Sequence, residues 1–129
     1  MSRHPIAGFI HPSLLLALML SLGVRDCLAQ TDISLASLKW QHRIILIRAA
    51  TSQSAALFKD ELEKSAADIV DRDIVWYVSY KEVLVHNHAA YGYDDASENL
   101  REALAARLSS DPSMHLLLIG KDGGVKVRA

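Results

Sequence analysis

The chain has 129 residues, a net charge of −1 with its histidines neutral, and 50% hydrophobic residues. A charge this close to neutral, without a cluster of Lys or Arg, excludes the basic surface expected of a protein that binds nucleic acid or an anionic membrane. The single cysteine, Cys27, excludes a disulfide within the chain.

The first 30 residues have the three-part layout of a secretory signal peptide. A basic start is followed by an apolar stretch over residues 14–24, and Cys27-Leu28-Ala29 places small side chains before Gln30. A membrane-spanning helix needs about 20 apolar residues, so this stretch is too short to cross a bilayer. We predict a signal peptide over residues 1–29, cleaved near Ala29, and a periplasmic or secreted protein. An uncleaved signal anchor is the alternative.

Cleavage before Gln30 would remove Cys27, the only cysteine of the chain. The exported domain, predicted over residues 30–129, would then contain no disulfide, thiolate metal site or thiol nucleophile. A single domain of this size can fold on its own.

The exported part begins with a predicted strand-helix-strand unit. Residues 43–49 form an apolar, β-branched run without alternation, which is typical of a central strand covered on both faces. Residues 74–80 are a dense β-branched and aromatic run that predicts a second strand. A right-handed crossover would make the two strands parallel. Between them, apolar residues repeat at helical spacing: Ala55, Phe58, Leu62, Ala66 and Ile69.

The second half predicts a long surface loop over residues 81–94, an amphipathic helix and a hairpin. Asp95 with Glu98 resembles a capping box at the start of that helix. The apolar residues 115–119, a Gly-rich turn and the alternating segment Val125 to Arg128 predict a β-hairpin with a buried first strand and an edge second strand. The order β-α-β-α-β-β predicts a thioredoxin-like α/β fold with a mixed four-stranded sheet, the C-terminal helix missing.

Four segments resemble the domain of unknown function 4174 family. They are the Leu-rich segment before Lys39-Trp40, Arg43-Ile44-Ile45-Leu46, Asp71-Arg72-Asp73-Ile74-Val75 and, above all, residues 118–126 with their Gly-Lys-Asp-Gly-Gly block. The resemblance covers residues from about 35 to 128. It implies a thioredoxin- or peroxiredoxin-like fold, an extracytoplasmic location and no agreed activity. The family includes bacterial secreted proteins and resembles repeated segments of animal extracellular coiled-coil-domain and sushi-repeat proteins.

A redox-active protein of this fold places its nucleophilic cysteine where the first strand is followed by the first helix. Here Thr51-Ser52-Gln53-Ser54 occupies that place, and a serine hydroxyl does not exchange disulfides. We therefore predict a module that binds non-covalently, without a cofactor. Two alternatives remain: a peroxiredoxin-like or thiol oxidoreductase activity, which needs Cys27 to be retained, and a truncated, inactive family member.

Four residues are candidate ligand contacts. Ser52 and Ser54 lie at a predicted helix N-terminus, where free N–H groups favour an anion, although capping is the commoner use of serine there. Lys121 and Asp122 belong to the Gly-rich turn. Its glycines are expected to supply positive φ for a hairpin, because a phosphate loop would open a helix instead.

His86 and His88 are the residues that suggest a metal, since a His-x-His pair places both rings on one side of an extended chain. No third ligand follows at a persuasive spacing, so no metal is predicted. A protein partner is predicted at the edge strand Val125 to Arg128, whose unpaired backbone could pair with another chain. We expect no nucleic-acid partner and no membrane span after cleavage.

Overall fold

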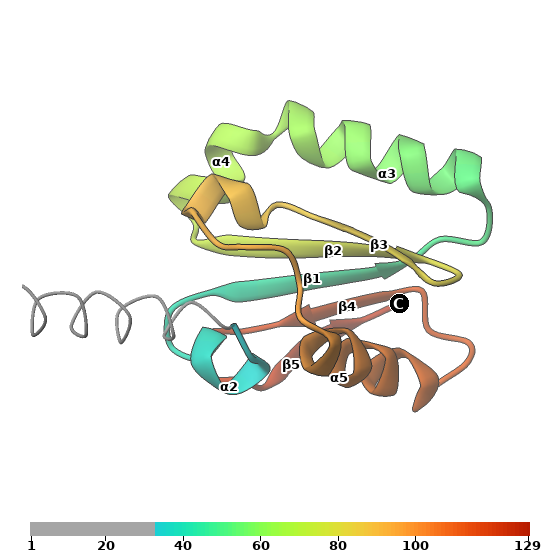
Figure 1. Cartoon of the computed structure of the whole chain (residues 1–129). Helices are drawn as coiled ribbons and strands as arrows, with labels where there is room; N and C mark the ends of the chain where they lie inside the picture. The colour runs from blue at the N-terminus through green and yellow to red at the C-terminus, as the bar shows by residue number, and fades with distance from the viewer. Residues whose placement is uncertain (1–32) are drawn as a thin grey trace, which may run out of the picture. The chain divides into compact units, whose positions relative to one another are not determined.

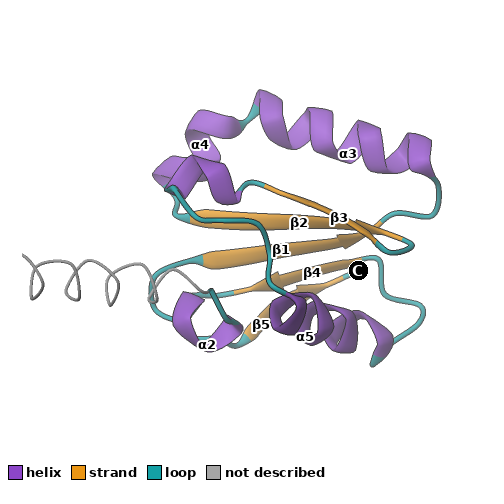
Figure 2. Cartoon of the chain, in the orientation of Figure 1, coloured by secondary structure: helices purple, strands orange, loops and turns teal. Residues whose placement is uncertain are grey.

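The computed structural model describes residues 33–129, so the predicted signal peptide and Cys27 lie outside the described residues. In chain order the elements are α2 (Leu35–Leu38), β1 (Arg43–Arg48), α3 (Ser52–Lys64), α4 (Ala66–Asp71), β2 (Ile74–Tyr80), β3 (Val83–His86), the 3₁₀ helix η1 (His88–Tyr91), α5 (Glu98–Ser109), β4 (Leu116–Ile119) and β5 (Val125–Arg128). Helices α3 and α4 cover one face of the sheet, and α2 and α5 cover the other (Figures 1 and 2). None of the helices in this part of the chain is long and apolar enough to cross a membrane.

The five strands form one mixed sheet in the order β3-β2-β1-β4-β5. Strand β1 is parallel to β2, with Ile44 opposite Val75, as the predicted crossover requires. It is antiparallel to β4, with Leu46 opposite Leu117, and β4 is antiparallel to β5. The predicted α/β class and closing hairpin are therefore confirmed, and the strand order is consistent with a thioredoxin-like arrangement.

Residues 81–94 are not the surface loop that was predicted. They contain strand β3, so the sheet has five strands instead of the predicted four. This strand pairs antiparallel with β2, and Tyr80 lies opposite Val83 across the turn Lys81-Glu82. This hairpin could not be predicted from the sequence, because its strand has only four residues and its turn lacks the glycine or asparagine typical of such turns. Lys81 instead adopts a φ of 50°.

Two apolar clusters form the core, one on each face of the sheet. In β2, Val75 and Tyr77 point to one face while Trp76 and Val78 point to the other, because successive strand residues alternate. Both faces are covered by helices, which explains why β1 and β2 have continuous rather than alternating hydrophobicity. From the helices, the cluster with Tyr77 includes Leu100, Leu104 and Leu108, and the cluster with Trp76 includes Ile69.

The helical segment after β1 begins where it was predicted but is divided in two. Ser65 separates α3 from α4 with non-helical dihedral angles, φ −99° and ψ 18°. Ala55 and Leu62 pack towards the sheet as their spacing predicts, whereas Phe58 stays 41% exposed. Phe58 lies three residues after Ala55, at the margin of the face that the sheet can cover.

The start of α5 also differs from the prediction. Its N-cap is Ser97, whose Oγ accepts a hydrogen bond from the N–H of Leu100 at 3.2 Å. Glu98 is the first helical residue and Asp95 lies outside the helix, so the two do not form the capping box that their spacing suggested. Asp95 instead accepts hydrogen bonds from His86 and Arg101.

Candidate functional site

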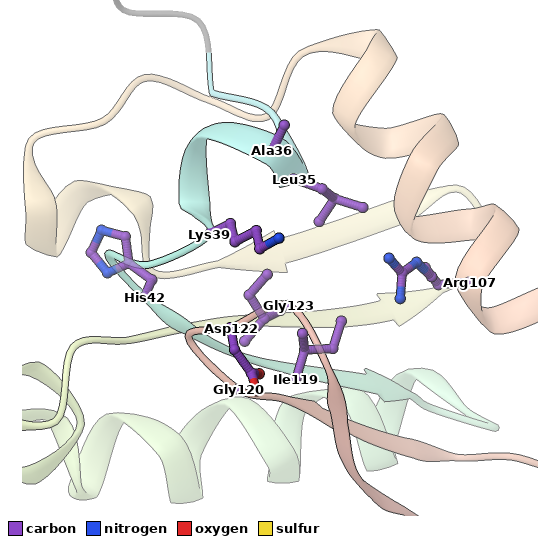
Figure 3. Close-up of a pocket in the computed structure, with 10 residues that line it drawn as sticks. Leu35, Ala36, Lys39, His42, Arg107, Ile119, Gly120, Asp122 and Gly123 are labelled. Atoms are coloured by element: carbon purple, nitrogen blue, oxygen red, sulfur yellow. The ribbon is translucent and has the colours of Figure 1, made fainter.

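The candidate site is a cavity of about 240 Å³ between α2, α5 and the turn that joins β4 to β5 (Figure 3). Apolar side chains of Leu35, Ile44 and Ile119 line it, together with the charged or polar side chains of Lys39, His42, Arg107 and Asp122. Sites for drug-sized ligands commonly measure about 300–1,000 Å³. A cavity of this size therefore suits a smaller molecule.

The short helix α2 brings Lys39 over the β4–β5 turn. Ser34 and Ser37 cap the helix reciprocally, each side chain accepting a hydrogen bond from the other's backbone N–H. The chain leaves the helix through Trp40, which has a φ of 70° and donates its N–H to the carbonyl oxygen of Lys121. This contact holds the Lys39 side chain against Gly123, where a Cβ atom would lie 3.4 Å from the Lys39 Cδ.

Two cations, Lys39 and Arg107, line this cavity. In Figure 3 the Lys39 ammonium and the Arg107 guanidinium point towards one another, from the end of α2 and from α5. Neither forms an ion pair with a carboxylate of residues 33–129. Arg107 lies in the last turn of α5, where a cation is also favoured by the helix dipole. The side-chain ammonium of Lys39 lies 5.3 Å from the centre of the Trp40 ring. The arrangement would be stabilised by an anion placed between the two groups.

Lys121 and Asp122, two of the predicted contacts, hold the turn itself together. Lys121 Nζ lies 2.7 Å from Asp73 Oδ2, and this hydrogen-bonded cation lowers the pKa of the Asp73 carboxyl. Asp122 accepts hydrogen bonds from Lys126 Nζ and from the N–H of Gly124, both at 2.9 Å, and the Lys126 contact lowers its pKa. Asp122 lines the cavity, but its charge is already matched by Lys126.

The other two predicted contacts are Ser52 and Ser54. They lie at the start of α3, after the C-terminal end of β1. Ser54 serves the helix cap, because its Oγ accepts the N–H of Thr51 at 3.1 Å while Thr51 Oγ1 accepts the N–H of Ser54 at 3.0 Å. Ser52 lines a separate, mainly apolar groove between α3 and strands β2 and β3. The structure therefore brings Lys121 and Asp122 together but not with these two serines.

The rings of His86 and His88 are neighbours, with centroids 4.1 Å apart. His88 donates from Nδ1 to the Asp94 carbonyl at 2.8 Å, so its Nε2 accepts from the Tyr77 hydroxyl at 2.7 Å. His86 accepts the backbone N–H of His88 at Nδ1 and contacts Asp95 through Nε2 at 2.7 Å. Every ring nitrogen thus has a protein partner, and burial lowers the pKa of His88. No group of three or more metal-ligating side chains was found within residues 33–129.

His42 is a buried residue of the cavity wall that was not predicted from the sequence. It is 6% exposed, and its Nδ1 donates to the Asp73 carbonyl at 3.1 Å while its Nε2 accepts from the Tyr93 hydroxyl at 2.7 Å. The only sequence signal was a histidine directly before an apolar strand. Lys39 and Arg107 gave no signal, because in a sequence they resemble any solvated cation.

Fold and site together define a mixed α/β domain that has a small cationic cavity and whose described residues include no cysteine. The chain belongs to the family described as Domain of unknown function (DUF4174), whose model matches residues 34–129. The family resemblance predicted from the four segments is therefore confirmed. Neither the curated proteins nor the solved structures include a significant match.

Proposed function

We propose that this domain works outside the cytoplasm as a non-covalent binding module with a thioredoxin-like fold. Its ligand would be a small anion with an apolar body, held in the cavity between α2 and α5. The observation that carries this proposal is the convergence of Lys39 and Arg107, without carboxylate partners among residues 33–129, over an apolar floor.

The cavity supports this ligand class in two ways. An anionic group between Lys39 and Arg107 would accept charge-assisted hydrogen bonds, which are about twice as strong as those between neutral groups. An apolar body would cover Leu35 and Ile119 and remove them from water. A ligand that has both parts should therefore bind more tightly than a ligand that has only one of them.

Isothermal titration calorimetry with three probes tests this ligand class. Hexanoate has both parts, hexanol lacks the charge and inorganic phosphate lacks the apolar body. We expect hexanoate to bind most tightly. Equal binding of hexanol and hexanoate would contradict the role of the two cations.

Variants of the cations test the site directly. Lys39→Gln and Arg107→Gln should each weaken hexanoate binding about tenfold, the effect of losing roughly 1.4 kcal/mol from one charged hydrogen bond. Lys64→Gln is the matched control, because Lys64 lies on α3, lines neither the cavity nor the apolar groove, and pairs with Glu61. Unchanged affinity in both cavity variants would refute the proposal.

The extracytoplasmic part of the proposal rests on the signal-peptide pattern of residues 1–29. Intact-mass measurement of the exported protein tests it. A product that starts at Gln30 would have lost Cys27, and with it the only possible nucleophile of the alternative thiol enzyme. A product that retains Cys27 would reopen that alternative.

We also propose that the edge strand β5 contacts a protein partner. Within the described residues it pairs only with β4, and all its residues are exposed. Ala129 exchanges both backbone hydrogen bonds with Leu116, so the backbone groups of the preceding Arg128 face away from β4. Pull-downs from envelope extract should lose partners when Lys126→Glu and Arg128→Glu are combined. Identical partner lists would mean that the hairpin only builds the fold.

A further inference from the structure

We propose that the opposite edge of the sheet, strand β3, binds an extended segment of a partner protein in which apolar and basic side chains alternate. This site is separate from both the anion cavity and β5. The inference rests on one juxtaposition: an edge strand is flanked by an apolar groove on one face of the sheet and by an acidic cavity on the other.

Strand β3 is open to pairing along one side. It is the first strand in the order β3-β2-β1-β4-β5, and within residues 33–129 it pairs only with β2. In an antiparallel pair every second residue directs its N–H and C=O away from the partner strand. These groups can accept a further strand, and Val83 at this edge is 60% exposed.

On the face covered by α3, an apolar groove of about 390 Å³ runs beside β3. Val78, Tyr80, Val83 and Val85 line its sheet side. Helix α3 contributes Ala55, Ala56, Ser52 and Lys59, whose charge is paired with Glu63. The small side chains of the two alanines leave this part of the sheet incompletely covered. Apolar side chains of an added strand would fill the groove.

On the opposite face, a cavity of about 660 Å³ separates β3 from α5. Glu82, Glu98 and Glu102 contribute three carboxylates, and none of them forms an ion pair with another residue of the described chain. Two cations, Lys81 and Arg101, also line this cavity. Arg101 is already paired with Asp95 at 3.1 Å, which leaves Lys81 to offset the three carboxylates. The charge of this cavity therefore complements Lys or Arg side chains.

An added strand would present its side chains alternately to the two faces. One set would enter the apolar groove and the other would reach the carboxylates of Glu98 and Glu102. Backbone hydrogen bonds supply affinity in this mode of recognition, and the pockets for alternate side chains supply specificity. The pattern that fits both pockets is therefore apolar-basic-apolar-basic.

Capped hexapeptides test this pattern with the exported protein, by NMR titration of its backbone amides. A peptide of alternating Val and Lys should shift the amide signals of Val83–His86. Peptides of alternating Val and Glu, or Ser and Lys, should bind at least about tenfold more weakly, since each lacks one of the two matches. Equal binding of the Val-Glu peptide would overturn the proposal.

Two pairs of substitutions locate the contact. Glu98→Gln combined with Glu102→Gln should weaken binding of the Val-Lys peptide about tenfold. The matched control is Asp60→Asn combined with Glu61→Gln, two exposed residues of α3 that neither line the groove nor pair with Lys59. Peptide binding should be unaffected by Lys39→Gln, which separates this site from the anion cavity. Shifts that map to β5, or an unchanged affinity in the α5 variant, would refute the assignment.

A second copy of the chain is the competing occupant, because β5 itself reads Val-Lys-Val-Arg. Sedimentation velocity distinguishes the two. A monomer supports a separate partner. A dimer or larger species that disappears in Arg128→Glu would assign β3 to a neighbouring copy and overturn the proposal of a different protein.

Discussion

Lys121 Nζ lies 2.7 Å from Asp73 Oδ2 and so joins the turn after β4 to the turn before β2. Asp73 has a φ of 56°, in the left-handed region. Its carbonyl oxygen accepts hydrogen bonds from the backbone N–H of Arg43 and the ring of His42. Asp73 thus connects the starts of β1 and β2 and the cavity-wall residue His42 to the β4–β5 turn.

Replacing Lys121 with Met should raise the pKa of the Asp73 carboxyl towards its ordinary value of 3.8, because the ammonium that lowers it is removed. In the wild type, the lowered pKa stabilises the folded state above pH 3.8, and this stabilisation is lost as the pH falls below that value. The variant should lose less stability on acidification. NMR titration of the carboxyl carbons measures the pKa. Lys126→Met is the matched control and should raise the pKa of Asp122 but leave that of Asp73 unchanged.

Acidification should also act through His88, whose pKa is lowered by burial. Below pH 6.5 the unfolded histidine takes up a proton while the folded one stays neutral, so the free energy of unfolding falls as the pH falls. His88→Gln should reduce this dependence between pH 7 and pH 5, as measured by urea denaturation. It should also cost about 1–3 kcal/mol if the buried Tyr77 hydroxyl loses its acceptor. A pH dependence that is unchanged in His88→Gln would contradict this role of His88.

The two consecutive glycines of the β4–β5 turn should respond differently to substitution. Gly123 has a φ of 82°, whereas Gly124 lies outside the left-handed region. Gly123→Ala should therefore destabilise the fold by about 1–2 kcal/mol, the cost of the left-handed region for a residue with a Cβ atom. Gly124→Ala should cost less, because its backbone lies outside the left-handed region. Its new Cβ would lie 3.3 Å from Oδ1 of Asp122, a side-chain atom that can shift slightly. Thermal denaturation compares the two variants, and equal losses would contradict this account of the turn.

Replacing one leucine by alanine in α5 and one in α3 should distinguish the buried face of α5 from the exposed face of α3. Leu104 is 1% exposed and belongs to the core, so Leu104→Ala should cost about 2–5 kcal/mol. Leu57 is 59% exposed, and Leu57→Ala should change the free energy of unfolding by less than about 0.5 kcal/mol. Urea denaturation of both variants measures the difference. Similar losses would mean that Leu57 is covered in solution.

The sequence predicted the elements whose residues repeat a clear physical pattern. Strands β1 and β2 are continuous apolar runs because helices cover both of their faces, and Gly123 marks the turn because it needs positive φ. Strand β3 was missed because it is short and follows a turn at Lys81. Elements with strong local preferences were therefore predictable, whereas a short strand after a turn without glycine or asparagine was not.

The candidate site was less predictable than the fold. Of the four predicted contacts, Asp122 lines the cavity, Lys121 bonds to Asp73 and Ser54 bonds to Thr51. The cavity depends on Lys39 and Arg107, which lie far apart in the chain and meet only when α2 and α5 pack on the same face of the sheet (Figure 3). Local spacing carries no information about such a meeting.

The two tryptophans occupy opposite environments, since Trp40 is 69% exposed and Trp76 only 3%. Trp40 directly follows Lys39 in the cavity wall, whereas Trp76 belongs to the core. The emission of Trp40 should be red-shifted and quenched by iodide, whereas that of Trp76 should be blue-shifted and protected from quencher. Single-tryptophan variants would thus give the protein two intrinsic optical reporters, one for occupancy of the cavity and one for unfolding.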